Sequence, residues 1–186
     1  MIRLGKEANR GRSAYGYTSY SQKDSYIGCF QHASAALKAG SSELKIEWTN
    51  GRKTLNPVNP AEFYPGDQAV DIIGVHYYDN PELGRMTTQE IWDRLYVQNN
   101  PGGGPQGAGL WLALAKSKDK PLSISEWGIW GREDPFYIEK MFQFFKTNAA
   151  NLAYESYFNC ADHHQIYPVA KFPITSAKYK ELWSKG

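Results

Sequence analysis

The sequence is poor in cysteine, with only Cys29 and Cys160 among 186 residues. The two cysteines form no CxxC motif and have no histidine at metal-ligand spacing, which argues against a zinc site and against a redox dithiol. Cys29 falls within a predicted helix and Cys160 just after a predicted strand. We therefore expect two buried free thiols. The sequence predicts no metal and no other cofactor.

Long apolar runs are also missing, so no transmembrane helix is predicted. The start of the chain does not resemble a signal peptide, because residues 1–5 lead straight into a strand pattern. The 21 basic and 19 acidic residues are interspersed, and the net charge is +2. This balance predicts neither a nucleic acid nor a membrane as a partner, and acidic polymers are not expected as ligands.

Strand and helix patterns alternate along the whole chain. Short runs with apolar period two end in polar or aromatic residues, and segments with helical spacing separate these runs. This alternation predicts an α/β fold with a parallel sheet and crossover helices, and residues 1–186 fit one domain. Strands are expected over residues 2–5, 43–48, 70–75, 122–126 and 152–158, and helices over 21–40, from 87, over 110–118, from 134 and through 179–183.

One stretch, residues 121–131, begins as a buried strand and then carries Glu126, two tryptophans and two glycines. In parallel α/β folds the carboxyl ends of strands hold catalytic groups, so Glu126 is a candidate for chemistry. From this stretch alone an alternative stays open: a partly exposed loop glutamate paired with a lysine or arginine.

A second glutamate, Glu7, follows the first predicted strand in the same way. The interval between Glu7 and Glu126 accommodates three strand–helix units of ~30 residues each. Barrel curvature brings such strand ends together across the mouth of the barrel, which a flat sheet does not do. Two carboxyls ~5–5.5 Å apart serve a retaining glycosidase: one attacks the anomeric carbon, and the other protonates the leaving oxygen.

Four motifs together resemble glycoside hydrolase family 26, the β-mannanase-like members of the retaining clan of (β/α)8 barrels. These motifs are the run Ile2–Asn9, the strand end with Trp48 and Asn50, the segment Tyr64–Tyr78 and the end Ser125–Gly128. The resemblance corresponds only to the fourth to eighth strands of that barrel, so it implies a partial TIM barrel of about five parallel strands.

The same resemblance implies roles for individual residues. Glu7 is expected to be the general acid/base, Glu126 the nucleophile, and Tyr78 a hydrogen-bond partner that keeps the nucleophile ionised. Substrate-binding candidates are Asn9, Trp48, Asn50, His76, Tyr78, Trp127 and Trp130, with the three tryptophans as sugar platforms. For His76, a satisfied core or rim histidine is an open alternative. The family also implies a secreted or periplasmic location.

The sequence departs from the family pattern at two places. Members commonly have histidine or an aromatic residue before the acid/base, where this chain has Lys6, which leaves the substrate and the pH optimum open. The loop over residues 10–17 lacks the tryptophans usual there, which argues against a wide sugar platform. Glu155, in the fifth strand, supports the site if it faces the barrel interior and is otherwise paired at the rim.

Five strands cannot close an eight-stranded barrel, so both edges of the sheet need cover. We expect a second chain to provide it, either another polypeptide or a copy of this one. The expected function is that of an endo-acting β-glycanase, with mannan ahead of mixed-linkage glucan and xylan. The alternatives are a non-catalytic carbohydrate-binding remnant of such an enzyme and an inactive fragment.

Overall fold

The computed structural model describes residues 1–11, 15–160, 163–167 and 171–184. Five parallel strands form one sheet in the order β1-β2-β3-β4-β5. The α/β class and the five parallel strands predicted from the sequence are confirmed. The strands are β1 (Ile2–Leu4), β2 (Ile46–Gly51), β3 (Ile72–Asp79), β4 (Leu122–Ile129) and β5 (Leu152–Tyr157).

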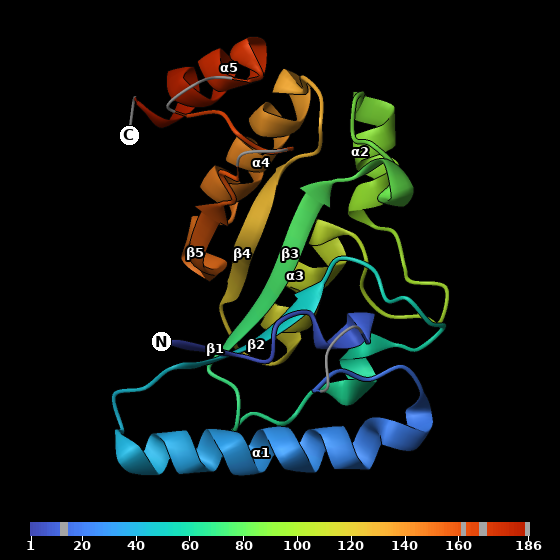
Figure 1. Cartoon of the computed structure of the whole chain (residues 1–186), viewed down its shortest axis with the longest axis vertical. Helices are drawn as coiled ribbons and strands as arrows, with labels where there is room; N and C mark the ends of the chain where they lie inside the picture. Colours follow the sequence, from blue (N-terminus) through green and yellow to red (C-terminus); the bar gives the residue numbers. More distant parts are fainter. Residues whose placement is uncertain (12–14, 161–162, 168–170, 185–186) are drawn as a thin grey trace.

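Helices alternate with the strands, and Figure 1 shows α1 along one margin of the molecule with α4 and α5 near the opposite one. The α-helices are α1 (Lys23–Gly40), α2 (Gln89–Tyr96), α3 (Ala108–Ser117), α4 (Pro135–Thr147) and α5 (Pro173–Trp183). Short 3-10 turns are η1 (Ala8–Arg10), η2 (Tyr20–Gln22), η3 (Pro60–Phe63), η4 (Pro81–Leu83) and η5 (Ala149–Asn151).

The beginnings of the helices follow local capping chemistry. The Asp134 carboxylate accepts a hydrogen bond from the Tyr137 N–H at 3.0 Å, and Pro135 opens α4 as predicted. At α2 the N-cap is Thr88, one residue later than predicted. Helix α1 begins two residues after the predicted start, because residues 20–22 form a separate 3-10 turn.

The two faces of the sheet differ in chemistry because successive parallel strands are joined by crossovers that place the helices on one side. The helix side is apolar: Trp48 packs against Trp111 of α3, and Trp127 packs against Phe145 of α4. The other side carries polar residues that contact one another across strands, namely Arg3, Glu47, His76, Tyr78, Glu126 and Tyr154. A parallel sheet with its helices on the outer side is the arrangement of a (β/α) barrel, in which functional residues gather at the carboxyl ends of the strands.

A β-bulge between β3 and β4 determines which side Glu126 faces. Gly74 pairs with Ser123, but His76 pairs with Glu126, so two steps along β3 match three along β4. Bulges of this kind re-aim side chains next to functional sites. Strict alternation would place Glu126 on the helix side with Ile124, whereas the bulge turns it to the polar side beside His76.

Three strands end later than predicted, and one of them is β2, which ends at Gly51 where the sequence predicted residue 48. Parallel pairing carries β4 on to Ile129 and β3 on to Asp79. The predicted strand end at Glu126 was therefore wrong by three residues. His76 and Tyr78 lie inside β3, where their side chains alternate onto the polar face, and not in the loop after it.

The prediction of buried thiols was also wrong, since Cys29 and Cys160 are both free and exposed. Residues 12–14, in the loop over residues 10–17, and residues 161–162 and 168–170, between the fifth predicted strand and the last predicted helix, lie outside the described residues. In the part of the chain that the structure describes, every helix is too short or too polar to cross a bilayer.

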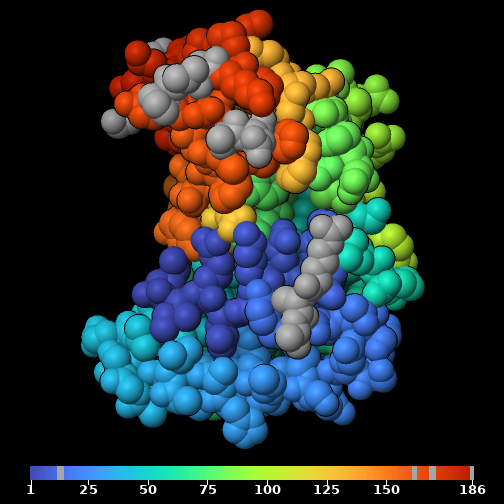
Figure 2. Space-filling model, viewed as in Figure 1, coloured from blue at the N-terminus to red at the C-terminus, as the bar shows by residue number. Residues whose placement is uncertain are grey.

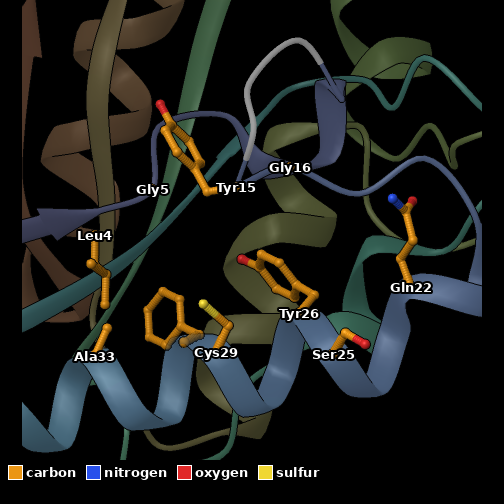
Figure 3. Close-up of a pocket in the computed structure, with 10 residues that line it drawn as sticks. Leu4, Gly5, Tyr15, Gly16, Gln22, Ser25, Tyr26, Cys29 and Ala33 are labelled. Carbon is orange, nitrogen blue, oxygen red and sulfur yellow. The ribbon is translucent and has the colours of Figure 1, made fainter.

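An apolar groove lies between the edge strand β1 and helix α1. It encloses a cavity of about 320 Å³, and its lining includes Leu4, Tyr15, Tyr26, Cys29, Phe30 and Ala33. Figure 3 shows Tyr26 and Cys29 pointing from α1 toward the side of the groove where Leu4 and Tyr15 lie. Apolar surface therefore borders the open edge of the sheet.

Candidate active site

Glu7 and Glu126 meet at a single histidine nitrogen. Nδ1 of His76 lies 3.2 Å from Oε1 of Glu7 and 3.4 Å from Oε2 of Glu126. The two carboxylate oxygens are therefore at most roughly 6.6 Å apart, near the spacing of retaining glycosidases. In a flat sheet, three strand spacings of ~4.8 Å would separate β1 from β4. The curvature of the sheet brings the two glutamates together.

The Glu126 carboxylate is contacted on both of its oxygens. Oε1 lies 2.9 Å from Nη1 of Arg3 and 3.2 Å from Nζ of Lys6. Oε2 accepts a hydrogen bond from the Tyr78 hydroxyl at 3.1 Å. The side chain is 12% exposed, so these donors take the place of water and hold the carboxylate in one orientation.

Tyr78 stays protonated in this environment. Burial and the negative charge of Glu126 raise the pKa of the Tyr78 phenol far above its ordinary value. A neutral phenol donates its single hydrogen, and here that hydrogen points to Glu126. Tyr78 is thus fixed as a donor to the candidate nucleophile.

Glu7 is positioned by strained backbone. It has a left-handed conformation with φ 47° and ψ 46°, which non-glycine residues seldom adopt and which is common at functional sites. Burial acts to raise the pKa of the Glu7 carboxyl, but the close contact with His76 and the charges of Arg10 and Lys6 outweigh burial and lower that pKa.

Asn9 holds this strained turn in place and does not face the pocket. Its side chain donates to the Gly51 carbonyl at 2.8 Å and accepts from the Gly51 N–H at 2.7 Å, and the residue is 1% exposed. Asn9 ties the segment that carries Glu7 to the end of β2. Its assignment as a sugar-binding residue is corrected to a positioning role.

Three further substrate-binding predictions are wrong because the residues are fully buried on the helix side of the sheet. The indole of Trp48 donates to the Tyr26 hydroxyl at 2.9 Å, and the indole of Trp127 donates to Glu155 at 2.5 Å. Asn50, on the same side as Trp48, accepts from the Tyr17 hydroxyl at 3.4 Å. None of the three presents a face to a sugar.

Glu155 also belongs to the helix side. Besides Trp127, it accepts from the indole of the partly buried Trp183 at 3.1 Å, so its carboxylate is the hydrogen-bond acceptor for two indoles. The residue therefore does not support the carboxylate pair from inside. Its buried counterpart on the polar side is Glu47, which contacts Arg3 and Tyr154.

A cavity of about 220 Å³ opens over the carboxylate pair, and Trp130 forms part of its wall. Trp130 is half-buried, stacks on His163 and meets Tyr78 edge-on. In Figure 2 the blue N-terminal residues lie directly below the orange C-terminal part, with green residues visible between them. The cavity lies where these parts meet, and its lining is Lys6, Glu7, Arg10, Arg52, His76, Tyr78, Asn80, Leu83, Glu126, Trp130, Phe158 and His164.

Sequence reasoning missed Arg3, Arg10 and Arg52. For Arg3 a signal existed, because a single arginine inside an apolar strand usually has a buried acidic partner. Arg10 and Arg52 stand in loop-like sequence that gave no such signal. Among the described residues, no three histidine, cysteine or acidic side chains gather in a way that could hold a metal ion.

The architecture is that of part of a (β/α) barrel: a curved parallel sheet, helices outside it, and two carboxyls toward the carboxyl ends of its strands. No model of a protein family matches the sequence, and no curated protein matches it. Solved structures, however, do match it.

GH26C from Muricauda sp. MAR_2010_75 is 21% identical with a TM-score of 0.70, over 98% of this chain and 47% of that one. A modular glycoside hydrolase family 26 endo-β-1,4-mannanase from Cellulomonas fimi is 18% identical with a TM-score of 0.67, and the match covers 98% of this chain and 40% of that one. The catalytic domain of a GH26 endo-β-1,4-mannanase from Bacillus sp. JAMB-750 is 19% identical with a TM-score of 0.66, and the match covers 98% of this chain and 49% of that one.

These likenesses show the fold, which is part of a family 26 type (β/α) barrel. The resemblance drawn from the four sequence motifs is confirmed at that level. The chain spans less than half the length of each of the three structures.

Proposed function

We propose that the chain acts as a retaining glycoside hydrolase on β-linked glycans, with mannan as the first candidate substrate. The observation that carries this proposal is the convergence of Glu7 and Glu126 on one nitrogen of His76, beneath an open cavity. Ion pairs that merely stabilise a fold seldom bring two carboxyls together at the mouth of a curved sheet, because like charges at that distance repel.

In the proposed mechanism Glu126 is the nucleophile. Arg3, Lys6 and Tyr78 orient its carboxylate, which attacks the anomeric carbon and forms a glycosyl ester. Glu7 donates a proton to the leaving oxygen, and then removes a proton from the water that cleaves the ester. Trp130, the tryptophan that lines the cavity, provides the stacking surface for a sugar ring.

The proposal predicts hydrolysis with retention of anomeric configuration. We expect the chain to release reducing ends from β-1,4-mannan, and the first product seen by proton NMR to be the β-anomer, since two inversions restore the configuration. Mixed-linkage glucan and xylan serve as comparison substrates. Release of the α-anomer first would refute the double displacement.

A second candidate function is carbohydrate binding without hydrolysis. It is favoured by the occupied oxygens of Glu126, since the ion pairs with Arg3 and Lys6 must loosen before the carboxylate attacks. Calorimetry with mannohexaose separates the two candidates: binding without release of reducing ends favours this one.

We also propose that a second chain covers the open edge of the sheet beside β1, where the apolar groove lies. The expected result is a dimer or larger species in light scattering, and weaker association after Tyr15→Ser, because Tyr15 lines the groove and is 51% exposed. A thermostable monomer at all concentrations would count against the second chain.

A further inference from the structure

Two arginines of the cavity are not used by the proposed reaction. Arg52 is 1% exposed, although it is charged at any physiological pH. Its Nη1 donates to the Tyr78 carbonyl at 3.3 Å, and its guanidinium lies 4.9 Å from the centre of the Tyr77 ring. Nε and Nη2 of Arg52 have no hydrogen-bond partner among the described residues. Buried charged donors without partners are costly, so they mark a place for a ligand.

Arg10 lines the same cavity and lies in η1, which follows β1, the parallel neighbour of the strand that leads to Arg52. The Nε of Arg10 is also buried and has no hydrogen-bond partner in the described part of the chain. The side chain packs against Gly51, where an added Cβ would lie only 2.6 Å from Cδ of Arg10. Asn9 also bonds this turn to Gly51 through two hydrogen bonds, so the position of Arg10 is fixed relative to β2.

In the described part of the chain neither arginine forms an ion pair with an acidic side chain, although the charge of Arg10 contributes to the lowered pKa of Glu7. Glu126 is engaged by Arg3 and Lys6, and Glu7 by His76. The nearby buried Asp79 accepts from the Met86 N–H at 2.8 Å and lies 3.6 Å from Arg85. Of the cavity-lining residues, only Glu7 and Glu126 are acidic, whereas Lys6, Arg10 and Arg52 are basic. The cavity thus keeps an excess of positive charge.

From this geometry we infer that the cavity selects a glycan that carries an anionic group, a carboxylate or a sulfate, bound by Arg52 and Arg10. This inference rests on the proposed function, which makes a glycan the ligand of the cavity. What the inference adds is that the glycan is negatively charged. A planar guanidinium matches a carboxylate or sulfate through two parallel hydrogen bonds, which a neutral sugar hydroxyl cannot do. The near-neutral balance of the whole chain, which argued against acidic polymers, does not describe this local site.

The test uses a thio-linked β-1,4-mannotriose, whose sulfur linkages resist hydrolysis, in three forms: neutral, oxidised to a uronate at one C6, and sulfated at one O6. Calorimetry at low salt is expected to show at least ~10-fold tighter binding of an anionic form, as charge-assisted pairs provide. The tighter of the two anionic forms identifies the group.

Arg10→Gln and Arg52→Gln are each expected to reduce the difference in affinity between the anionic and the neutral trisaccharide to about threefold or less. The matched variant Arg94→Gln, at an exposed residue of α2, should leave the ratio of the two affinities unchanged. Circular dichroism checks folding; if Arg52→Gln does not fold, Arg10→Gln decides. Equal binding of all three forms by the unmodified chain, or a preference that survives Arg10→Gln in a folded protein, overturns the inference.

Failure of this inference is distinguishable from failure of the proposed function. Reducing ends are assayed in parallel with ordinary β-1,4-mannan and with its partly oxidised form. Cleavage of mannan without any preference for the anionic forms retains the hydrolase and rejects the anion site. Selective binding of an anionic trisaccharide with no cleavage of either polymer retains the anion site and rejects the hydrolase.

Discussion

Glu126→Gln is expected to abolish hydrolysis, with kcat reduced on the order of 10⁴-fold or more, equivalent to about 5.5 kcal/mol of lost transition-state stabilisation. Glutamine has nearly the same shape as glutamate, but its amide can neither attack the anomeric carbon nor oppose the positive charge that develops there. The measurement is the initial rate of reducing-end release from β-1,4-mannan, with the fold checked by circular dichroism.

The fold of this variant should survive, because Arg3 keeps its contact with Glu47 and Tyr78 can donate to the amide oxygen. A matched change at Glu90, exposed in the first turn of α2, provides the control and should leave turnover unaltered. If Glu126→Gln hydrolyses mannan at the rate of the unmodified chain, Glu126 is not the nucleophile.

The positions of the strands followed directly from the sequence, because period-two apolar runs separated by helical segments allow few arrangements other than a parallel sheet. The ends of β2, β3 and β4 did not follow from it. Strand length depends on pairing with a neighbour, and pairing is a contact between residues far apart in the chain. Polar residues such as His76 and Glu126 continue a strand when the neighbouring strand supplies the backbone partners.

The tryptophans show why side-chain roles were harder to assign. Trp48 shares the period-two face of Ile46, so burial against the helices could have been read from alternation. Trp127 could not be placed in this way. The bulge between Gly74 and His76 on one strand and Ser123 and Glu126 on the other reverses the alternation. The bulge therefore places Trp127 on the helix side, and no local sequence pattern predicts the bulge.

The environment of the carboxylate pair was likewise beyond the sequence. Arg3 and Glu126 are 123 positions apart, and their contact exists only because β1 curves toward β4. Lys6 directly precedes Glu7 in the sequence, yet its ammonium lies 3.2 Å from Oε1 of Glu126. Burial and charge partners decide such roles, and both are properties of the assembled sheet.

The second large effect is expected at Glu7. Glu7→Gln removes the proton donor, so hydrolysis of β-1,4-mannan should slow by ~10²–10⁴-fold, the usual contribution of general acid catalysis. A 2,4-dinitrophenyl glycoside needs no proton on its leaving group, and its first step should be slowed far less. Equal losses on both substrates would contradict the assignment of Glu7 as the acid.

The lowered pKa of Glu7 gives this prediction a pH dependence. Glu7 must be protonated for the first step, so kcat/KM on mannan is expected to fall as pH rises through the pKa of Glu7, which places the optimum on the acid side.

His76→Gln removes the largest of the influences that lower this pKa. The pKa of Glu7 should rise, and the alkaline limb of the profile should move to higher pH, while the matched change at the exposed His32 leaves it in place. The dinitrophenyl substrate should not show this limb, because its departure does not depend on a protonated Glu7. A limb that stays in place in His76→Gln would mean that the contact between His76 and Glu7 does not control the proton.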